Sequence, residues 1–117
     1  MINSYRDLLV WKKGMSLVTD IYTMTQTFPS NEQYGLTSQM RRSAISIPSN
    51  IAEGYGRNST GDYARFLQIA VGSTFELQTQ IEIAFNLKFI TQEDFITNLE
   101  KAKELDRMLL SLIRKIK

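Results

Sequence analysis

The sequence predicts an all-α protein, folded as an antiparallel up-down-up-down four-helix bundle. Four stretches carry apolar residues at spacings of three and four, which is the period of an amphipathic helix. Short segments rich in Gly, Pro, Ser and Asn separate these stretches, and no run alternates between apolar and polar residues as a strand would. The 117 residues, of which 43% are hydrophobic and 22% charged, suit one globular domain over residues 1–117.

The first helix is expected over residues 4–27. Ser4 followed by Asp7 is a capping-box pattern, and Phe28-Pro29 is expected to stop the helix. One apolar series consists of Leu8, Trp11, Met15, Val18 and Tyr22. A second series, with Gly14 among its members, consists of Val10, Leu17, Ile21 and Met24. Two series predict a helix that touches more than one neighbour.

The second helix is expected to begin between Ser30 and Thr37. Its inward positions are Leu36, Met40, Ala44, Ile47 and Ile51. Pro48 has no N–H, so the carbonyl of Ala44 loses its usual donor and the helix is expected to kink at Pro48.

The end of this helix is polar and rich in glycine. The hydroxyls of Ser46 and Ser49 are expected to satisfy part of the backbone that Pro48 frees. Gly54 and Gly56 are expected to supply the left-handed conformation that ends many helices.

The third helix is expected from Ser59, which forms a second capping-box pattern with Asp62, to about Lys88. Its inward positions are Tyr63, Leu67, Ala70, Thr74, Leu77, Ile81 and Ala84. These positions alternate strictly between steps of three and four, as in bundle packing. An apolar patch on the other side is predicted to be a subunit contact, and it consists of Ile69, Ile83 and Leu87 with Gly72 among them.

The fourth helix is expected to open at Thr91, with Asp94 three residues on. Its inward residues are Phe95, Leu99, Ala102, Leu109, Ile113 and Ile116, with Leu105, Met108 and Leu112 on the flank. Its last turns are basic and hold Arg107, Arg114, Lys115 and Lys117 without an acid. Such a tail suits the negative end of a helix dipole and also suits a phosphate partner.

The composition excludes much of the common enzyme chemistry. The chain contains no His and no Cys, which removes imidazole bases, thiol nucleophiles and most zinc ligands. The remaining carboxylates, lysines, tyrosines and hydroxyls match no metal-binding or phosphate-loop spacing. We therefore expect no enzyme, no catalytic residue, no cofactor and no metal. With no apolar run near 20 residues and no signal-peptide pattern, a cytoplasmic protein without a membrane partner is expected.

Three segments together resemble the four-helix-bundle family of proteins encoded in intervening sequences of bacterial 23S ribosomal RNA genes, also called the S23 ribosomal protein family. The segments are DLLVWKKGM, FPSNEQYGLTSQMRRSAISIPSNIAEGYGR and FLQIAVGSTFELQTQIEIA. The most specific part is IPSNIAEG, from Ile47 to Gly54, with the preceding GLTSQMRRS. Gly14 departs from the pattern, because the family more often has an alanine after its W-x-K pattern.

The resemblance implies an antiparallel bundle that assembles as a homo-oligomer, with pentamers as the expected arrangement. It also implies a possible role in nucleic-acid binding, since that is the usual suggestion for the family. A more distant similarity is to the accessory proteins of diversity-generating retroelements, which are basic pentameric bundles that work with a reverse transcriptase. No catalytic residue follows from the resemblance.

The stretch from Thr37 to Arg57 offers two interpretations. Ser46, Asn50 and Glu53 either line a polar pocket beside Pro48 or repair the hydrogen bonds that Pro48 breaks. Glu53 either pairs with Arg57 on the helix surface or pairs with Arg41 or Arg42 of a neighbouring subunit. The predicted oligomer interface therefore consists of Arg41, Arg42, Glu53, Ile69, Ile83 and Leu87.

The candidates for contact with nucleic-acid phosphates are the clustered bases. They are Lys12, Lys13, Arg41, Arg42, Arg57, Arg65, Arg114, Lys115 and Lys117. The net charge of +2 permits such a partner without requiring it. Nearby Tyr55, Tyr63 and Phe66 would either stack on bases or, as the period favours for Tyr63 and Phe66, pack in the core.

Two functions remain open from the sequence. The first is a non-enzymatic homo-oligomer that binds structured RNA or DNA through its basic faces. The second is an interaction scaffold with a protein partner and no role with nucleic acid, which the spare apolar patch favours.

Overall fold

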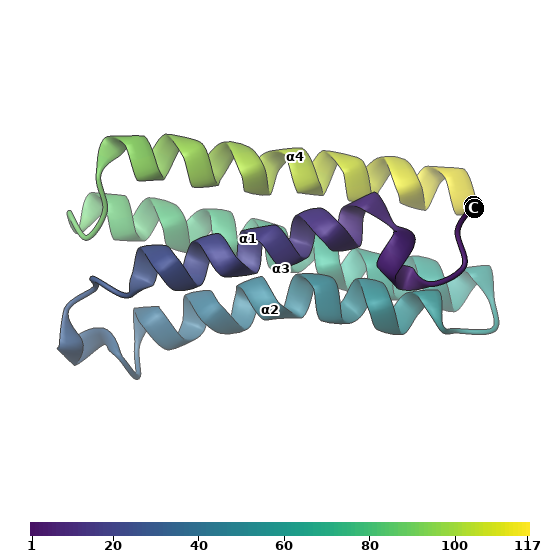
Figure 1. Ribbon diagram of the computed structural model, residues 1–117, viewed down its shortest axis with the longest axis horizontal. Helices are drawn as coiled ribbons and strands as arrows, with labels where there is room; N and C mark the ends of the chain where they lie inside the picture. The colour runs from purple at the N-terminus through teal and green to yellow at the C-terminus, as the bar shows by residue number, and fades with distance from the viewer.

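Four α-helices and two short 3₁₀ turns make up the regular structure of this computed structural model, which describes residues 1–117 (Figure 1). In chain order they are η1 (Tyr5–Asp7), α1 (Leu9–Thr25), η2 (Ser30–Glu32), α2 (Leu36–Tyr55), α3 (Thr60–Asn86) and α4 (Gln92–Ile116). Strands are absent, and the all-α four-helix prediction is confirmed. No helix combines the length and the apolar character needed to cross a membrane.

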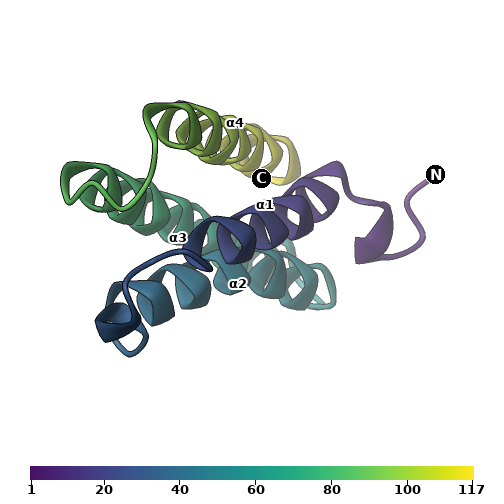
Figure 2. The ribbon, with the colours of Figure 1, turned by 60° about the vertical axis from the view of Figure 1, so that its left-hand side comes forward.

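Consecutive helices run in opposite directions along the long axis of the molecule (Figure 1). Each helix packs against its neighbours in the order α1, α2, α3 and α4, and the contact between α1 and α4 closes the arrangement. In the turned view α4 and α2 lie on either side of α1, and the N-terminal segment leaves the bundle sideways (Figure 2). The core lies along the axis between the four helices and contains the largest buried side chains, such as Leu17, Ile51, Leu77 and Leu109.

The first helix begins at Leu9, five residues later than predicted. The capping box of Ser4 and Asp7 exists, but it caps η1, and an extended Leu8 separates this turn from α1. The Asp7 carboxylate accepts hydrogen bonds from the N–H groups of Asn3 and Ser4 at 2.8 and 3.2 Å, which hold the pKa of Asp7 below its ordinary value of 3.8.

The two apolar series of α1 are buried to different degrees. The residues that face the core are Val10, Gly14, Leu17, Ile21 and Met24, which belong to the second series. In the other series, Met15 and Tyr22 are 44% and 37% exposed and the remaining members are partly buried. Gly14 belongs to the buried series, and a Cβ atom at this position would make ordinary van der Waals contact with Pro48 and Ile47 of α2 at 3.5 and 3.6 Å.

The core positions of α2 were predicted well, but the roles of its glycines were not. Met40, Ala44, Ile47 and Ile51 are fully buried, and the helix continues past Pro48 to Tyr55. The kink expected at Pro48 stays a prediction. No glycine in the chain has a positive φ, so the predicted left-handed ends at Gly54 and Gly56 are wrong.

Position 54 requires glycine because α3 leaves no room there for a side chain. A Cβ atom at this position would lie 2.7 Å from the Cβ of Phe66 and 3.3 Å from Tyr63, since the last turn of α2 presses against the start of α3. Gly56, just after the helix, has a right-handed φ of −81°.

The last two helices begin as predicted. Ser59 and Thr91 accept hydrogen bonds from the backbone N–H groups of Asp62 and Asp94, both at 3.1 Å. The inward positions of α3 from Leu67 to Ala84 are buried. In α4, Leu105 is 1% exposed and belongs to the core, although it was expected on the flank.

Candidate nucleic-acid interface

The bases of the chain gather in one half of the bundle. In Figure 1 the start of α1, the connection between α2 and α3 and the end of α4 meet at the right-hand end. We call residues 1–16, 46–73 and 105–117, which form this half, the basic half. It holds nine of the 14 lysines and arginines: Arg6, Lys12, Lys13, Arg57, Arg65, Arg107, Arg114, Lys115 and Lys117. Four of the 12 acids lie in these ranges, namely Asp7, Glu53, Asp62 and Asp106, and a fifth, Glu104, lies at their border, where it pairs with Lys13.

Seven of the nine predicted phosphate-contact residues lie in the basic half. Arg41 and Arg42 do not, because they stand in the first half of α2, before residue 46. Within the basic half Lys13 is partly engaged, since its Nζ lies 2.9 Å from Oε1 of Glu104. Arg114, Lys115 and Lys117 carry no ion pair, and neither does Lys12.

Two guanidinium groups of the basic half share one aromatic ring. The Cζ atoms of Arg57 and Arg65 lie 4.6 and 4.7 Å from the ring centroid of Phe66. Each guanidinium also faces a carboxylate. Nη2 of Arg57 lies 3.5 Å from Oε1 of Glu53, and Nη2 of Arg65 lies 3.6 Å from Oδ1 of Asp62. The surface pairing of Glu53 with Arg57 is therefore confirmed.

The aromatic residues near these bases serve mainly as packing. Phe66 is 8% exposed, and Tyr63 packs edge-on against Tyr55 with a centroid distance of 6.0 Å. Burial, with the neighbouring Tyr55 as a smaller cause, raises the pKa of the Tyr63 phenol above its ordinary value of 10.0.

Arg41 is bound to its own chain. Its Nε donates to Oγ1 of Thr25 at 2.9 Å, its Nη2 donates to the carbonyl of Tyr22 at 3.5 Å, and its Cζ lies 4.4 Å from the ring centroid of Tyr22. The positive charge thus sits at the last turn of α1, where it complements the helix dipole. Arg41 therefore has a structural role that the sequence pattern did not indicate.

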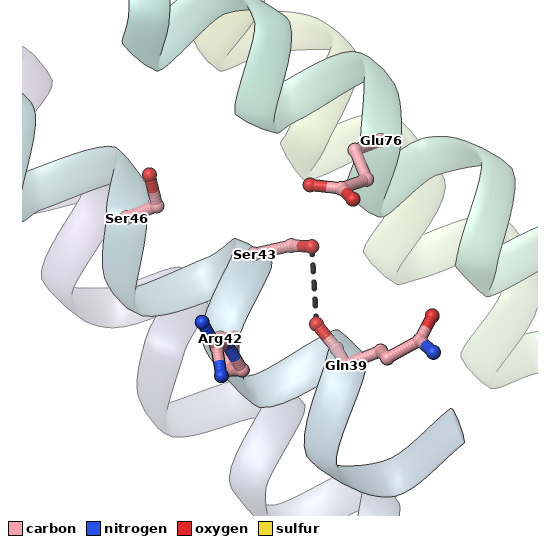
Figure 3. A pocket seen from close by; sticks show the side chains of 5 residues that line it. All are labelled: Gln39, Arg42, Ser43, Ser46 and Glu76. Carbon is pink, nitrogen blue, oxygen red and sulfur yellow. Dashed lines mark hydrogen bonds between the residues drawn. The ribbon is translucent and has the colours of Figure 1, made fainter. Parts of the chain in front are cut away.

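Arg42 borders a polar groove between α2 and α3 (Figure 3). The groove has a volume of about 320 Å³, and its lining consists of Gln39, Arg42, Ser43, Ser46 and Glu76. The hydroxyl of Ser43 donates to the carbonyl of Gln39 at 3.0 Å. Arg42 and Glu76 project from opposite helices without forming an ion pair within the chain.

The polar cluster around Pro48 links two helices. Ser46 and Ser73 share a hydrogen bond of 2.8 Å between their hydroxyls, and Nδ2 of Asn50 donates to the carbonyl and to the hydroxyl of Ser46. The repair of the Ala44 carbonyl expected from Ser46 is therefore wrong, because the Ser46 hydroxyl bonds to α3 instead. Glu53 points away to Arg57 and does not join this cluster.

Exposed apolar side chains form a patch on α3 and line a groove between α1 and α2. On α3 the predicted patch is at the surface, with Ile69, Ile83 and Leu87 exposed by 43%, 41% and 52%. The second face is a groove of about 320 Å³ between α1 and α2, which sequence reasoning missed. It is lined by Tyr5, Trp11, Met15, Val18, Ile45, Pro48, Ser49 and Ala52. Its signal was the first apolar series of α1, to which Trp11, Met15 and Val18 belong.

The chain offers no acidic cluster for a metal ion, since no three carboxylates converge.

Comparison with known proteins supports the resemblance seen in the sequence. The family model described as "23S rRNA-intervening sequence protein" matches residues 6–111. A crystal structure of a protein with unknown function from the S23 ribosomal protein family of Bacteroides thetaiotaomicron VPI-5482 is similar to the chain with a TM-score of 0.80 and 26% sequence identity. The match covers 90% of this chain and 98% of that chain. No curated protein matches significantly.

Proposed function

Since the chain belongs to the family of 23S rRNA-intervening sequence proteins, we propose that it acts without catalysis as a homo-oligomeric bundle that binds structured RNA or DNA through its basic half. Structured RNA is the first candidate, because the family name refers to ribosomal RNA. This function would place the protein in the cytoplasm.

The segregation of charge carries the proposal. The basic half holds nine bases and four acids, whereas residues 17–45 and 74–104 hold five bases and eight acids. A cationic end attracts a polyanion over a distance of about one Debye length, roughly 8 to 10 Å at moderate salt. The acidic end disfavours the same partner, so nucleic acid would approach the molecule from one direction.

Assembly into a homo-oligomer, with a pentamer as the expected form, is supported by the two exposed apolar faces. They differ in composition and lie on different helices, so one copy can offer its α3 patch to the α1–α2 groove of the next. A contact between two different faces is heterologous and generates a ring when the rotation closes. A ring would bring several basic halves to one rim, which multiplies the attraction for phosphates.

A mobility-shift titration tests the nucleic-acid part of the proposal. The protein is titrated with a fluorescent RNA hairpin and with duplex DNA at salt concentrations from 25 to about 300 mM. Replacement of Arg114, Lys115 and Lys117 by Gln should lower the affinity about tenfold or more and reduce the slope of log K against log salt, by about 0.7 to 0.9 for each lost phosphate contact. A double variant at the acidic end, Lys101→Gln with Lys103→Gln, is the control and should change the affinity little. If the unaltered protein shifts neither probe at 25 mM salt, the nucleic-acid part is refuted.

Complementary variants test the assembly. Met15→Glu damages the α1–α2 groove and Ile83→Glu damages the α3 patch, so each variant alone should sediment as a monomer. An equimolar mixture should form a dimer and nothing larger, because each variant keeps one intact face. Ile96→Glu, at a residue of α4 that is 51% exposed, is the control and should assemble normally. A monomeric unaltered protein at tens of micromolar would refute the homo-oligomer.

The alternative is an interaction scaffold for another protein, and the α1–α2 groove favours it. An amphipathic helix can lie in a groove of this kind and bury its apolar face. A monomer that binds no nucleic acid would leave this function as the better one.

A further inference from the structure

The corner between α2 and α3 holds a cluster that packing alone does not explain. Arg57 comes from the connection after α2, and Arg65 comes from the second turn of α3, yet both guanidinium groups lie within 4.7 Å of the centroid of the Phe66 ring. Arginine over an aromatic ring gains a cation–π attraction, and the stack fixes the plane of the guanidinium.

The corner is well suited to hold these groups in place. Gly54 lets the backbone of α2 approach Phe66 so closely that even a methyl group at Gly54 would collide with it. Phe66 is itself 8% exposed and therefore has little room to move. The two cations consequently have a defined spacing before any ligand arrives.

The ion pairs at this corner are weak and replaceable. Nη2 of Arg57 lies 3.5 Å from Glu53 and Nη2 of Arg65 lies 3.6 Å from Asp62, both longer than the roughly 2.7 to 2.9 Å of a charge-assisted hydrogen bond. All four side chains are exposed by 42 to 59%, so water and salt screen the pairs. Because neither carboxylate is at hydrogen-bond distance, a phosphate group, which can accept two parallel N–H donors from one guanidinium, can replace it.

We infer that Arg57 and Arg65, held on the ring of Phe66, form a clamp for the sugar-phosphate backbone of the bound nucleic acid, and that Glu53 and Asp62 restrain the clamp until phosphate replaces them. This inference rests on the proposed function and names the contact point within the basic half. The cluster carries two bases and two acids, so it adds little to long-range attraction. Its contribution is short-range and depends on the stacked geometry.

Three double variants test the clamp: two are expected to lower the affinity for RNA, and the third is expected to raise it. Arg57→Ala with Arg65→Ala should lower the affinity for a fluorescent RNA hairpin by tenfold or more and reduce the salt slope by about 1.4 to 1.8. Arg57→Lys with Arg65→Lys should keep the slope, because the charges remain, but should lower the affinity several-fold, because lysine cannot stack or bind in a fork. Glu53→Gln with Asp62→Asn should raise the affinity several-fold. The Lys101→Gln, Lys103→Gln variant again serves as the control, and helix content by circular dichroism verifies the folding of each variant.

The outcomes separate the clamp from the wider proposal. If RNA binds to the unaltered protein and the Arg57→Ala, Arg65→Ala variant binds equally well, the clamp is overturned while the basic half remains the interface. If the glutamine and asparagine substitutions leave the affinity unchanged or lower it, the restraint by Glu53 and Asp62 is overturned. If the lysine variant binds as tightly as the arginines do, the stacked geometry has no role. The absence of any binding by the unaltered protein overturns both the clamp and the proposed function.

Discussion

Gly14 and Gly54 are both buried glycines inside helices, yet they are there for different reasons. A Cβ atom at Gly14 would lie 3.5 Å from two carbons of Pro48 and 3.6 Å from Ile47, which is ordinary van der Waals contact. A Cβ atom at Gly54 would lie 2.7 Å from the Cβ of Phe66. A methyl group fits at Gly14 but not at Gly54, although both positions are glycine in the sequence.

Gly14→Ala is expected to stabilise the protein by about 0.5 to 1 kcal/mol, because alanine loses less backbone entropy in a helix and its methyl group fits against Pro48. Urea unfolding followed by circular dichroism measures the change. Gly72→Ala, where nothing lies within 4 Å of the added carbon, is the control for helix propensity alone. A loss of stability in Gly14→Ala would contradict the packing described for α1 and α2.

Gly54→Ala is expected to destabilise the protein by about 1 to 3 kcal/mol, because the added methyl group forces α2 and α3 apart at Phe66. The same unfolding measurement gives the free energy of unfolding. Gly61→Ala, at a position with open space in the first turn of α3, should change it by less than about 0.5 kcal/mol. Equal stability of the two variants would mean that the close approach is not required.

At the scale of the helices, α3 is unusual because a lysine, not a glycine, adopts the left-handed conformation at its end. Lys88 follows the helix with φ of 64° and is the only residue of the chain with a positive φ outside glycine. The N–H groups of Lys88 and Phe89 donate to the carbonyls of Phe85 and Ala84, both at 2.9 Å, which is the Schellman motif. The sequence pattern offered no glycine at this point, so the left-handed position had no local signal.

Lys88→Gly should stabilise the protein by about 1 kcal/mol, since glycine adopts this conformation without the steric cost of a Cβ atom. Lys88→Ala separates charge from geometry: it removes the charge but keeps the Cβ, and it should leave the stability within about 0.5 kcal/mol of the unaltered protein. Thermal and urea unfolding report both changes. A Lys88→Gly variant that is no more stable than Lys88→Ala would argue against strain at this position.

The helix α1 illustrates what periodicity can and cannot decide. Two apolar series run along it, and each has the spacing of a buried face. Which one turns inward depends on how α2 and α4 pack against α1, and the second series is the buried one. Trp11, Met15 and Val18 of the first series then line the α1–α2 groove, a surface that periodicity alone did not reveal.

At the scale of the whole molecule, burial rather than ion pairing holds the bundle closed. The contact between α1 and α4 is bridged by two ion pairs, Lys13 with Glu104 at 2.9 Å and Lys101 with Asp20 at 2.6 Å. Both pairs are partly exposed, so each is expected to contribute about 1 kcal/mol or less. Leu109 of α4 is fully buried in the core between the helices.

Leu109→Ala should therefore cost about 2 to 5 kcal/mol of unfolding free energy, whereas Lys101→Met should cost less than about 1. Urea unfolding at 50 mM and at 500 mM salt gives both values and shows how far salt screens the ion pair. If Lys101→Met lowered the free energy of unfolding as much as Leu109→Ala does, ion pairing would matter as much as burial, which would contradict this prediction.

The sequence by itself determined the four helices, their connections and most of the core, because spacings of three and four, caps at Ser59 and Thr91, and short turns are local properties. It also identified seven of the bases that lie in the basic half and the exposed patch of Ile69, Ile83 and Leu87. Only the tertiary structure decided which stripe of α1 faces inward, that Arg41 binds the end of α1, and that Arg57 and Arg65 meet on Phe66. These facts depend on contacts between residues far apart in the chain, and such contacts follow from how the helices pack rather than from their period.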